Sequence, residues 1–211
     1  MAKNNPSYHY EYLFTKQGFS LIAGIDEAGR APLAGPVAAG AVILDLSAIH
    51  PWLADVQDSK LVSARMRQKL ESIIQREAIS WGVGMVSSAE IDSFGIARAA
   101  RLAMKKAVSL LKPPPQAILV DYFRLPEVNL PQQGITRGDS LSYSIACASI
   151  LAKVARDRLM EEMDERYPGY GFCRNKGYPT LEHLEALKKR GPCPIHRISF
   201  RPLKPQLGME S

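Results

Sequence analysis

The sequence predicts an α/β domain followed by a basic helical appendage. Short apolar runs of strand length occupy much of the first 121 residues, and longer segments with helical spacing of apolar residues lie between and after them. Positive charge is concentrated near the C-terminus. Residues 166–204 contain nine Lys or Arg and two Asp or Glu, a net charge of +7, whereas the whole chain carries +6. The rest of the chain is therefore close to neutral.

Short apolar runs predict four strands. Residues 79–87 alternate between apolar and small or polar side chains, which is typical of a half-buried strand. The run "AILVD" at 117–121 is a short buried strand that ends in a carboxylate. The predicted strands cover residues 20–27, 36–45, 79–87 and 117–121.

Helical periodicity predicts four helices, which cover residues 62–78, 88–111, 139 to about 167, and 181–190. Ser63 can cap the first helix, and the three prolines at 113–115 end the second. Gly191 and Pro192 stop the last helix. The first half of the long third helix is rich in Ser and Ala, so we expect it to pack closely on the sheet.

Composition excludes several classes of protein. The hydrophobic fraction of 46% and the charged fraction of 23% are ordinary for a folded globular domain and do not fit a disordered chain. No apolar run approaches the ~20 residues that a membrane-spanning helix needs. The first residues, "MAKNNPSYHYEYLF", lack the apolar core of a signal peptide. We therefore expect a cytoplasmic protein without a membrane partner.

The cysteines and histidines predict neither a disulfide framework nor a metal site. The three cysteines are odd in number and widely spaced, and the four histidines show no HxxxH or HxH spacing. We expect Cys147, Cys173 and Cys193 to be free thiols in a reducing compartment.

The basic segment over residues 166–204 suggests a polyanionic partner, because Lys and Arg neutralise phosphates and release counter-ions. The alternative is a solvated basic tail. Aromatic residues and glycines are interleaved with the charges in "YPGYGFCRNKGYPT", which favours a shaped binding surface.

Two adjacent carboxylates, Asp26 and Glu27, end the first predicted strand. Neighbouring side chains of a regular strand face opposite ways, so the two can serve one site only where the strand ends or bulges, which Gly29 permits. In the structural alternative, Glu27 faces solvent and Asp26 pairs with Arg30 or Lys60. On this stretch alone the two interpretations weigh equally.

Asp121 changes that balance. It also ends a predicted strand, at the edge where open α/β sheets bind ligands. Clustered carboxylates repel one another by about 4 kcal/mol per close pair at an effective dielectric of about 20, so they persist chiefly where cations neutralise them. An oxygen set without Cys or His favours Mg²⁺ or Mn²⁺.

Asp139 and Asp157 are further candidates on the long predicted helix. They lie on one face about 27 Å apart, so both cannot belong to one metal site. Asp139, in "RGDS" at the helix start, points into a loop-lined cleft, and the alternative for it is a plain helix N-cap. Asp157 lies in mid-helix between Arg156 and Arg158, where a role as an ion-pair partner is favoured.

Several motifs occur in a fixed order along the chain: "GIDEAGR" and "GP" within 24–36, "DSK" at 58–60, "LVD" at 119–121, "GDS" and "ASILAKVARD" within 138–157, and "KGYPT" at 176–180. With these motifs the chain closely resembles bacterial ribonuclease HII over roughly residues 20–200. The resemblance implies a ribonuclease H-like fold, which is a mixed five-stranded sheet flanked by helices, with a C-terminal helical region.

The resemblance also implies an activity. This is endonucleolytic cleavage of RNA in RNA–DNA hybrids and incision 5′ of single ribonucleotides in duplex DNA, leaving a 3′-hydroxyl and a 5′-phosphate. The family's four metal-binding acids correspond to Asp26, Glu27, Asp121 and Asp139. Two divalent ions, Mg²⁺ or Mn²⁺, would flank the scissile phosphate, one activating water and the other stabilising the leaving 3′ oxygen.

Contacts to the ribonucleotide are implied by a second correspondence. The family's Gly-Arg-Gly motif, whose main chain contacts the 2′-hydroxyl, corresponds to Gly29, Arg30 and Ala31, with alanine at the third position. A positive φ would strain a non-glycine residue. We therefore expect a negative φ at Ala31, so that alanine still supplies its amide and carbonyl.

Other substrate contacts follow from the same resemblance. The tyrosine that stacks on the sugar following the ribonucleotide corresponds to Tyr178. Lys60 and Lys153 match family positions near the backbone phosphates. The family often has His where Asn175 stands here, so a role for a ring at this position is excluded.

The expected organisation has four parts: an N-terminal extension over 1–19, a catalytic domain over 20–165, a basic substrate-binding region over 166–204 and a disordered tail over 205–211. We expect a monomer. The rivals are a type HIII-like hybrid ribonuclease with weak junction activity, a non-catalytic hybrid-binding protein and a resolvase-type nuclease that cuts branched DNA. The "DEAGR" start and the absence of a long N-terminal extension argue against type HIII.

Overall fold

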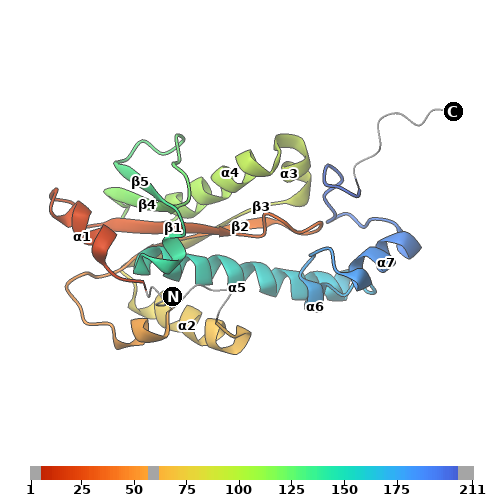
Figure 1. The fold of residues 1–211 in the computed structure, drawn as a ribbon, viewed down its shortest axis with the longest axis horizontal. Helices are drawn as coiled ribbons and strands as arrows, with labels where there is room; N and C mark the ends of the chain where they lie inside the picture. The colour runs from red at the N-terminus through yellow and green to blue at the C-terminus, as the bar shows by residue number, and fades with distance from the viewer. Residues whose placement is uncertain (1–5, 57–61, 204–211) are drawn as a thin grey trace.

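The computed structural model of the chain describes residues 6–56 and 62–203. Its centre is a five-stranded sheet with the strand order β3-β2-β1-β4-β5 (Figure 1). β2 pairs antiparallel with both β1 and β3, whereas β1, β4 and β5 run parallel, so the sheet is mixed as predicted. The strands are β1 (Ile22–Ala28), β2 (Val37–Ile43), β3 (Ser80–Val86), β4 (Ala117–Asp121) and β5 (Gln132–Ile135).

The fifth strand, β5, is the one that local sequence pattern did not predict. Its sequence, "QQGI", has one β-branched residue and no alternation. The strand is defined by its pairing with β4, from Ile118 opposite Gln132 to Asp121 opposite Ile135. Strand formation here depends on a neighbour rather than on intrinsic preference.

Helices cover both faces of the sheet (Figure 1). On one face, α5 (Tyr143–Arg166) packs against β1 and β2, and α2 (Ala64–Glu77) packs against α5. On the other face, α4 (Ile96–Ser109) packs against β2 and β3. The predicted close packing of α5 is confirmed at Gly24 of β1, where an added Cβ would collide with the main chain of Ser144.

The predicted helix over 88–111 is two helices, α3 (Ser88–Phe94) and α4, rather than one. The chain breaks at Gly95, whose φ is +78°, a conformation that glycine adopts without strain. Ser87 and Glu90 form a reciprocal capping box at the start of α3. The two helices can therefore point in different directions.

The long helix also starts later than predicted. Gly138–Ser140 form a short 3₁₀ turn, η2, and α5 begins at Tyr143 with Ser142 as its cap. Asp139 is therefore not the N-cap of a helix. It lies in the turn that follows Arg137, which has a positive φ of 58°.

Three short helices were not predicted: α1 (His9–Thr15), η1 (Pro51–Asp55) and α6 (Phe172–Asn175). α1 is joined to the start of α5, because the buried Glu11 carboxylate accepts hydrogen bonds from the Ser142 hydroxyl at 2.7 Å and from the Ser144 amide at 3.0 Å. The predicted helix at 181–190 is confirmed as α7 (Leu181–Arg190), capped by Thr180. No described helix is long and apolar enough to cross a membrane.

Candidate active site

All four acids that the sequence singled out line one pocket of about 440 Å³. Its wall also includes the loop after β1, the middle of α5 and Tyr178 from the C-terminal region. Asp26 and Asp139 are buried, at 5% and 7% exposure. Segments that are more than a hundred residues apart in the chain therefore meet at this point.

The sheet explains why Asp26 and Asp121 meet. The parallel ladder between β1 and β4 ends at Ile25 opposite Val120, and the two acids are the next residues on their strands. The antiparallel ladder between β1 and β2 continues past this point with a regular register. Asp26 and Glu27 thus lie where β1 has left one of its two neighbours. The prediction that they share a site only where the strand ends or bulges is therefore wrong: β1 continues without a bulge to Ala28, yet both acids line the pocket because β4 no longer pairs beside them.

Asp139 reaches the pocket through a hydrogen bond made by its neighbour. The Gly138 amide donates to Asp121 Oδ1 at 2.6 Å, which ties the η2 turn to the end of β4. The mid-helix Asp157 lies outside this pocket. The prediction that Asp139 and Asp157 cannot share one site is confirmed, although the helix between them starts four residues after Asp139.

Burial and mutual repulsion dominate the electrostatics of the acids. Burial, followed by the charges of Glu27 and Asp121, holds the pKa of Asp26 well above its usual value. Burial also raises the pKa of Glu27, against the opposing effect of Arg30, whose Nη1 lies 3.2 Å from Glu27 Oε1. Burial and repulsion disfavour the charged form of these carboxylates, and a cation that enters among them would stabilise that form.

The acids match the requirements of a divalent cation such as Mg²⁺ or Mn²⁺. The pocket is lined by carboxylates without Cys or His, which is the ligand chemistry of hard cations. Glu27 Oε2 is buried and has no hydrogen-bond partner among the described residues. Within those same residues, no three His, Cys, Asp or Glu side chains form a closed metal-binding cluster. The acids therefore line one pocket without already forming a closed metal site, and a bound cation would draw their carboxylates together.

The loop predicted to contact the ribonucleotide lines the same pocket. Gly29 has a φ of +92°, and an added Cβ there would collide with the Arg156 side chain, so both conformation and space require glycine. Ala31 is not among the residues with positive φ, as predicted. Tyr178, which is 40% exposed, lies in the pocket wall with its ring partly accessible to a ligand. Lys60 lies outside the described residues.

Comparison with known proteins assigns the chain to a family. The family model for ribonuclease HII matches residues 23–202. A ribonuclease HII from Dehalococcoides mccartyi is 53% identical over 199 residues, which cover 94% of each chain. One from Moorella thermoacetica is 50% identical over 194 residues, which cover 92% of this chain and 93% of that one. This chain belongs to the ribonuclease HII family. Membership assigns it the ribonuclease HII activity and a dependence on metal.

Solved structures agree with the ribonuclease HII assignment. The ribonuclease H2 from Pyrococcus horikoshii OT3 superposes with a TM-score of 0.72 at 27% identity, covering 86% of this chain and 94% of that one. The structure of Bst-RNase HIII in complex with Mn²⁺ superposes with a TM-score of 0.65 at 20% identity, so the two chains share the fold.

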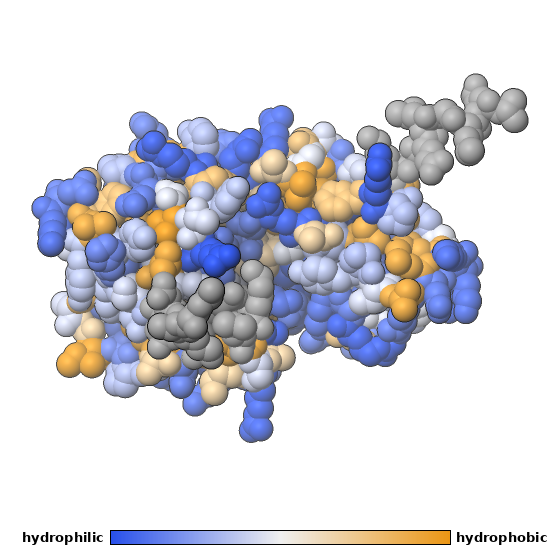
Figure 2. Space-filling view, in the orientation of Figure 1, coloured by the Kyte–Doolittle hydropathy of each residue, from blue (hydrophilic) through white to orange (hydrophobic). Residues whose placement is uncertain are grey.

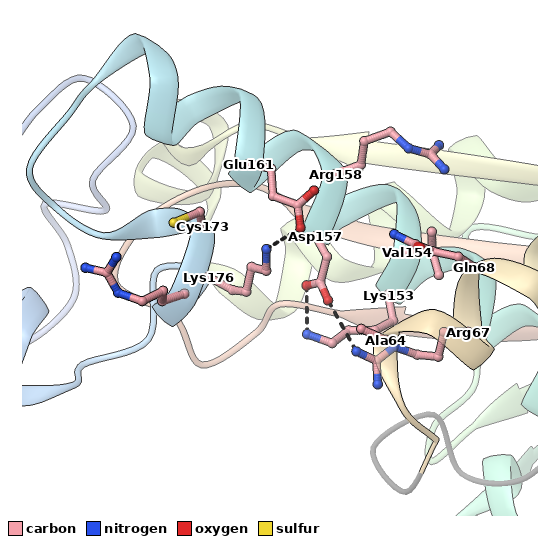
Figure 3. A pocket seen from close by; sticks show the side chains of 11 residues that line it. Ala64, Arg67, Gln68, Lys153, Val154, Asp157, Arg158, Glu161, Cys173 and Lys176 are labelled. Carbon is pink, nitrogen blue, oxygen red and sulfur yellow. Dashed lines mark hydrogen bonds and ion pairs between the residues drawn. The ribbon is translucent and has the colours of Figure 1, made fainter.

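Asp157 belongs to a neighbouring pocket of about 410 Å³ between α2, α5 and α6 (Figure 3). Its carboxylate pairs with Lys153 at 2.7 Å and with Arg67 at 3.7 Å. The predicted ion-pair role is confirmed, but its partners are not the adjacent arginines. Arg158 pairs with Glu71 at 2.8 Å, and Arg156 bonds to main-chain carbonyls. Lys153 and Arg67 line both pockets, so this ion-pair network borders the active site.

Sequence reasoning missed three polar or charged side chains that line the active-site pocket: Ser149, Arg156 and Arg67. Ser149 forms a hydrogen bond that lowers the pKa of Asp26, against the larger effects that raise it. Ser149, Lys153 and Arg156 are spaced by four and three residues, so they share one face of α5. That spacing was available in the sequence and predicts that all three point toward one site. Arg67 lies on α2, and no spacing in the sequence relates it to the residues of α5.

The basic segment over 166–204 is not uniformly a solvated face. Arg197 is fully buried, Lys176 pairs with Glu161 at 2.6 Å, and Arg174 pairs with Glu182. The exposed large apolar side chains of this region include Tyr178 and Leu181. Figure 2 shows hydrophobic and hydrophilic residues intermingled over this end of the molecule. The segment is a folded surface with selected charges exposed.

Proposed function

We propose that this ribonuclease HII hydrolyses the RNA strand of RNA–DNA hybrids and incises 5′ of single ribonucleotides embedded in duplex DNA. The products are a 3′-hydroxyl on the DNA and a 5′-phosphate on the ribonucleotide. One observation carries the proposal: the four acids, the Gly29–Ala31 loop and Tyr178 all line one pocket. A single bound nucleotide can therefore contact groups that recognise the sugar and groups that act on the phosphate.

The four acids would hold two divalent ions, Mg²⁺ or Mn²⁺, at the scissile phosphate. Bound there, these ions supply a nucleophilic water at neutral pH and stabilise the charge of the leaving oxygen. Support comes from the all-oxygen donor set and from the buried Glu27 oxygen that lacks a partner among the described residues. Arg30, which pairs with Glu27 in this structure, would release that carboxylate when cations enter.

Protein groups would orient the substrate. The main chain at Gly29–Ala31 would bind the 2′-hydroxyl, which only a ribonucleotide carries. The half-exposed ring of Tyr178 would stack on the sugar of the next nucleotide. Lys153, in the wall of the same pocket, would neutralise a backbone phosphate. Duplex affinity would come from exposed basic residues of segment 166–204, and the enzyme would act as a monomer.

The rival functions are less well supported. The chain is about 50% identical to ribonuclease HII relatives, whereas its likeness to a type HIII enzyme, at 20% identity, concerns the fold alone. A non-catalytic hybrid-binding protein has no need of four acids in one pocket, where the charges of the other three raise the pKa of Asp26. A resolvase-type nuclease has no need of a loop and ring that match ribonucleotide recognition.

A cleavage assay tests the proposal. The substrates are a DNA duplex with one ribonucleotide, the same duplex without it, and a branched DNA junction, each with Mg²⁺, with Mn²⁺ and with chelator. We expect one cut, 5′ of the ribonucleotide, that requires metal. Metal-independent binding without cleavage would support the hybrid-binding rival, and cleavage of the branched DNA would support the resolvase rival. Either result overturns the proposal.

A further inference from the structure

Two buried arginines hold the loop between β1 and β2, residues 29–36. Arg156 of α5 is 1% exposed and Arg197, which follows α7, is 0% exposed. Together they donate six hydrogen bonds to carbonyl oxygens of this loop. Main-chain bonds add to the attachment: the amide of Arg197 donates to Leu33 O and the amide of Gly35 donates to Ile195 O, each at 2.8 Å. The loop is therefore fixed to the C-terminal region.

Arg197 contacts the recognition loop at both of its ends. Its Nη2 donates to Gly29 O at 2.7 Å and to Pro36 O at 3.0 Å. Its Nη1 donates to Arg30 O at 3.0 Å, and its Nε donates to Gly35 O at 2.9 Å. One guanidinium thus spans the loop from its first residue to its last.

The burial of this cation indicates a specific role. Among the described residues no carboxylate forms an ion pair with Arg197, and burial together with the nearby Arg156 charge lowers its pKa to about 9. A charge buried without a counter-ion is unfavourable unless its donors are well satisfied. The planar guanidinium supplies several donors in fixed directions, which a lysine ammonium cannot reproduce.

Peptide geometry extends the effect of Arg197 to the pocket. In a trans peptide the C=O of one residue and the N–H of the next point in opposite directions. When Arg197 holds the carbonyls of Gly29 and Arg30, the amides of Arg30 and Ala31 point away from the guanidinium. Neither amide has a hydrogen-bond partner in the described part of the chain, and both residues line the active-site pocket.

We propose that Arg197 is a positioning residue for ribonucleotide recognition, and that it aims the Arg30 and Ala31 amides at the substrate's 2′-oxygen as a pair of donors. This inference rests on the proposed function of the Gly29–Ala31 main chain. It assigns a conformational role to a residue of the basic segment, whose exposed cations would instead act through charge. Arg197 never touches the nucleic acid.

Kinetics separate positioning from charge. Arg197→Lys keeps the positive charge but loses the planar guanidinium with its several donors. Lys189→Met removes an exposed charge from the same segment and serves as the matched control. For Arg197→Lys we expect at least a roughly tenfold lower kcat on the single-ribonucleotide duplex, with unchanged affinity and salt slope on an all-DNA duplex. For Lys189→Met we expect unchanged kcat, a higher KM and a smaller salt slope.

A second variant guards against misfolding of Arg197→Lys, which thermal unfolding would reveal. The Arg197 guanidinium lies 5.1 Å from the ring centroid of Phe200, so Phe200→Leu loosens the arginine without removing it. We expect a roughly two- to threefold lower kcat, again without a change in all-DNA affinity. Parental kcat in the folded Arg197 variant, or in Phe200→Leu if the former does not fold, overturns the inference. A parent chain that does not cut the single-ribonucleotide duplex refutes the proposed function instead.

Discussion

Asp121 Oδ1 accepts a hydrogen bond from the Gly138 amide at 2.6 Å, and this contact joins the end of β4 to the turn that carries Asp139. It links two of the four acids through the main chain, so that the fold rather than a metal brings them near one another. Binding of cations would then complete an arrangement that β1, β4 and η2 have already prepared.

Replacing Asp26 or Asp121 by Asn should abolish cleavage. The change removes a negative charge while keeping size, so the metal site weakens and the fold remains. We expect at least a roughly hundredfold lower kcat at ordinary Mg²⁺, with hybrid binding largely intact. Because burial and repulsion raise the pKa of Asp26, Asp26→Asn should not lower the thermal stability.

Asp157→Asn is the matched control for the acids. It removes one carboxylate from α5 outside the pocket, together with its ion pairs to Lys153 and Arg67. We expect a far milder effect, within about tenfold of the parent kcat. Near-normal turnover by Asp26→Asn, or a complete loss in Asp157→Asn, would contradict the assignment of the metal site.

Exposed lysines of α7 should contribute to duplex affinity through phosphates. The double variant Lys188→Gln with Lys189→Gln removes two charges from this helix, and Arg98→Gln with Lys105→Gln removes two from α4, which packs on β2 and β3. We expect the first pair to reduce the slope of log Kd against log salt by about one to two and the second to leave it unchanged. Equal slopes in all three proteins would show that the basic segment is only a solvated face.

Ala31→Gly should have little effect on incision of single-ribonucleotide duplexes. Ala31 does not have a positive φ, so alanine meets no backbone strain that glycine would relieve. We expect kcat/KM within about threefold of the parent on this substrate and on a long RNA–DNA hybrid. If only the glycine variant cuts the single-ribonucleotide duplex, the alanine methyl crowds the sugar and our account of the main role fails.

The stability of the C-terminal region should fall below neutral pH. His183 Nε2 lies 3.0 Å from His196 Nε2, and both rings are buried. Burial lowers the pKa of His183, and it lowers that of His196 to about 4. A depressed pKa means that the unfolded chain binds protons first, so stability is full above pH ~6.5 and declines as the pH falls toward 4.

Urea unfolding between pH 4.5 and 7.5 measures this effect. For His196 the decline should reach about 2 kcal/mol by pH 5. His196→Gln should be less stable at pH 7, because it loses the bonds to His183 and to the Cys193 amide, but its stability should vary less with pH. A parallel pH dependence in parent and variant would show that the histidine pair is not responsible.

The sequence by itself determined the α/β class and four of the five strands, and it picked out the four acids that the structure brings into one pocket. These features depend on local signals: apolar runs, helical spacing and carboxylates at strand ends. Motif resemblance added the family and the candidate substrate contacts, because each motif keeps its residues within a few positions along the chain.

Only the tertiary structure decided how distant residues meet. The pairing of β5, the break at Gly95 and the late start of α5 depend on neighbours that the local pattern does not contain. The burial of Arg197 beneath the Gly29 loop, 168 residues earlier in the chain, has no signature in the sequence, where Arg197 is one of nine Lys or Arg residues of the basic segment. A basic side chain can bind the substrate or stabilise the fold. Which of the two it does depends on the carbonyl oxygens that surround it, and only the packing of the folded chain determines those.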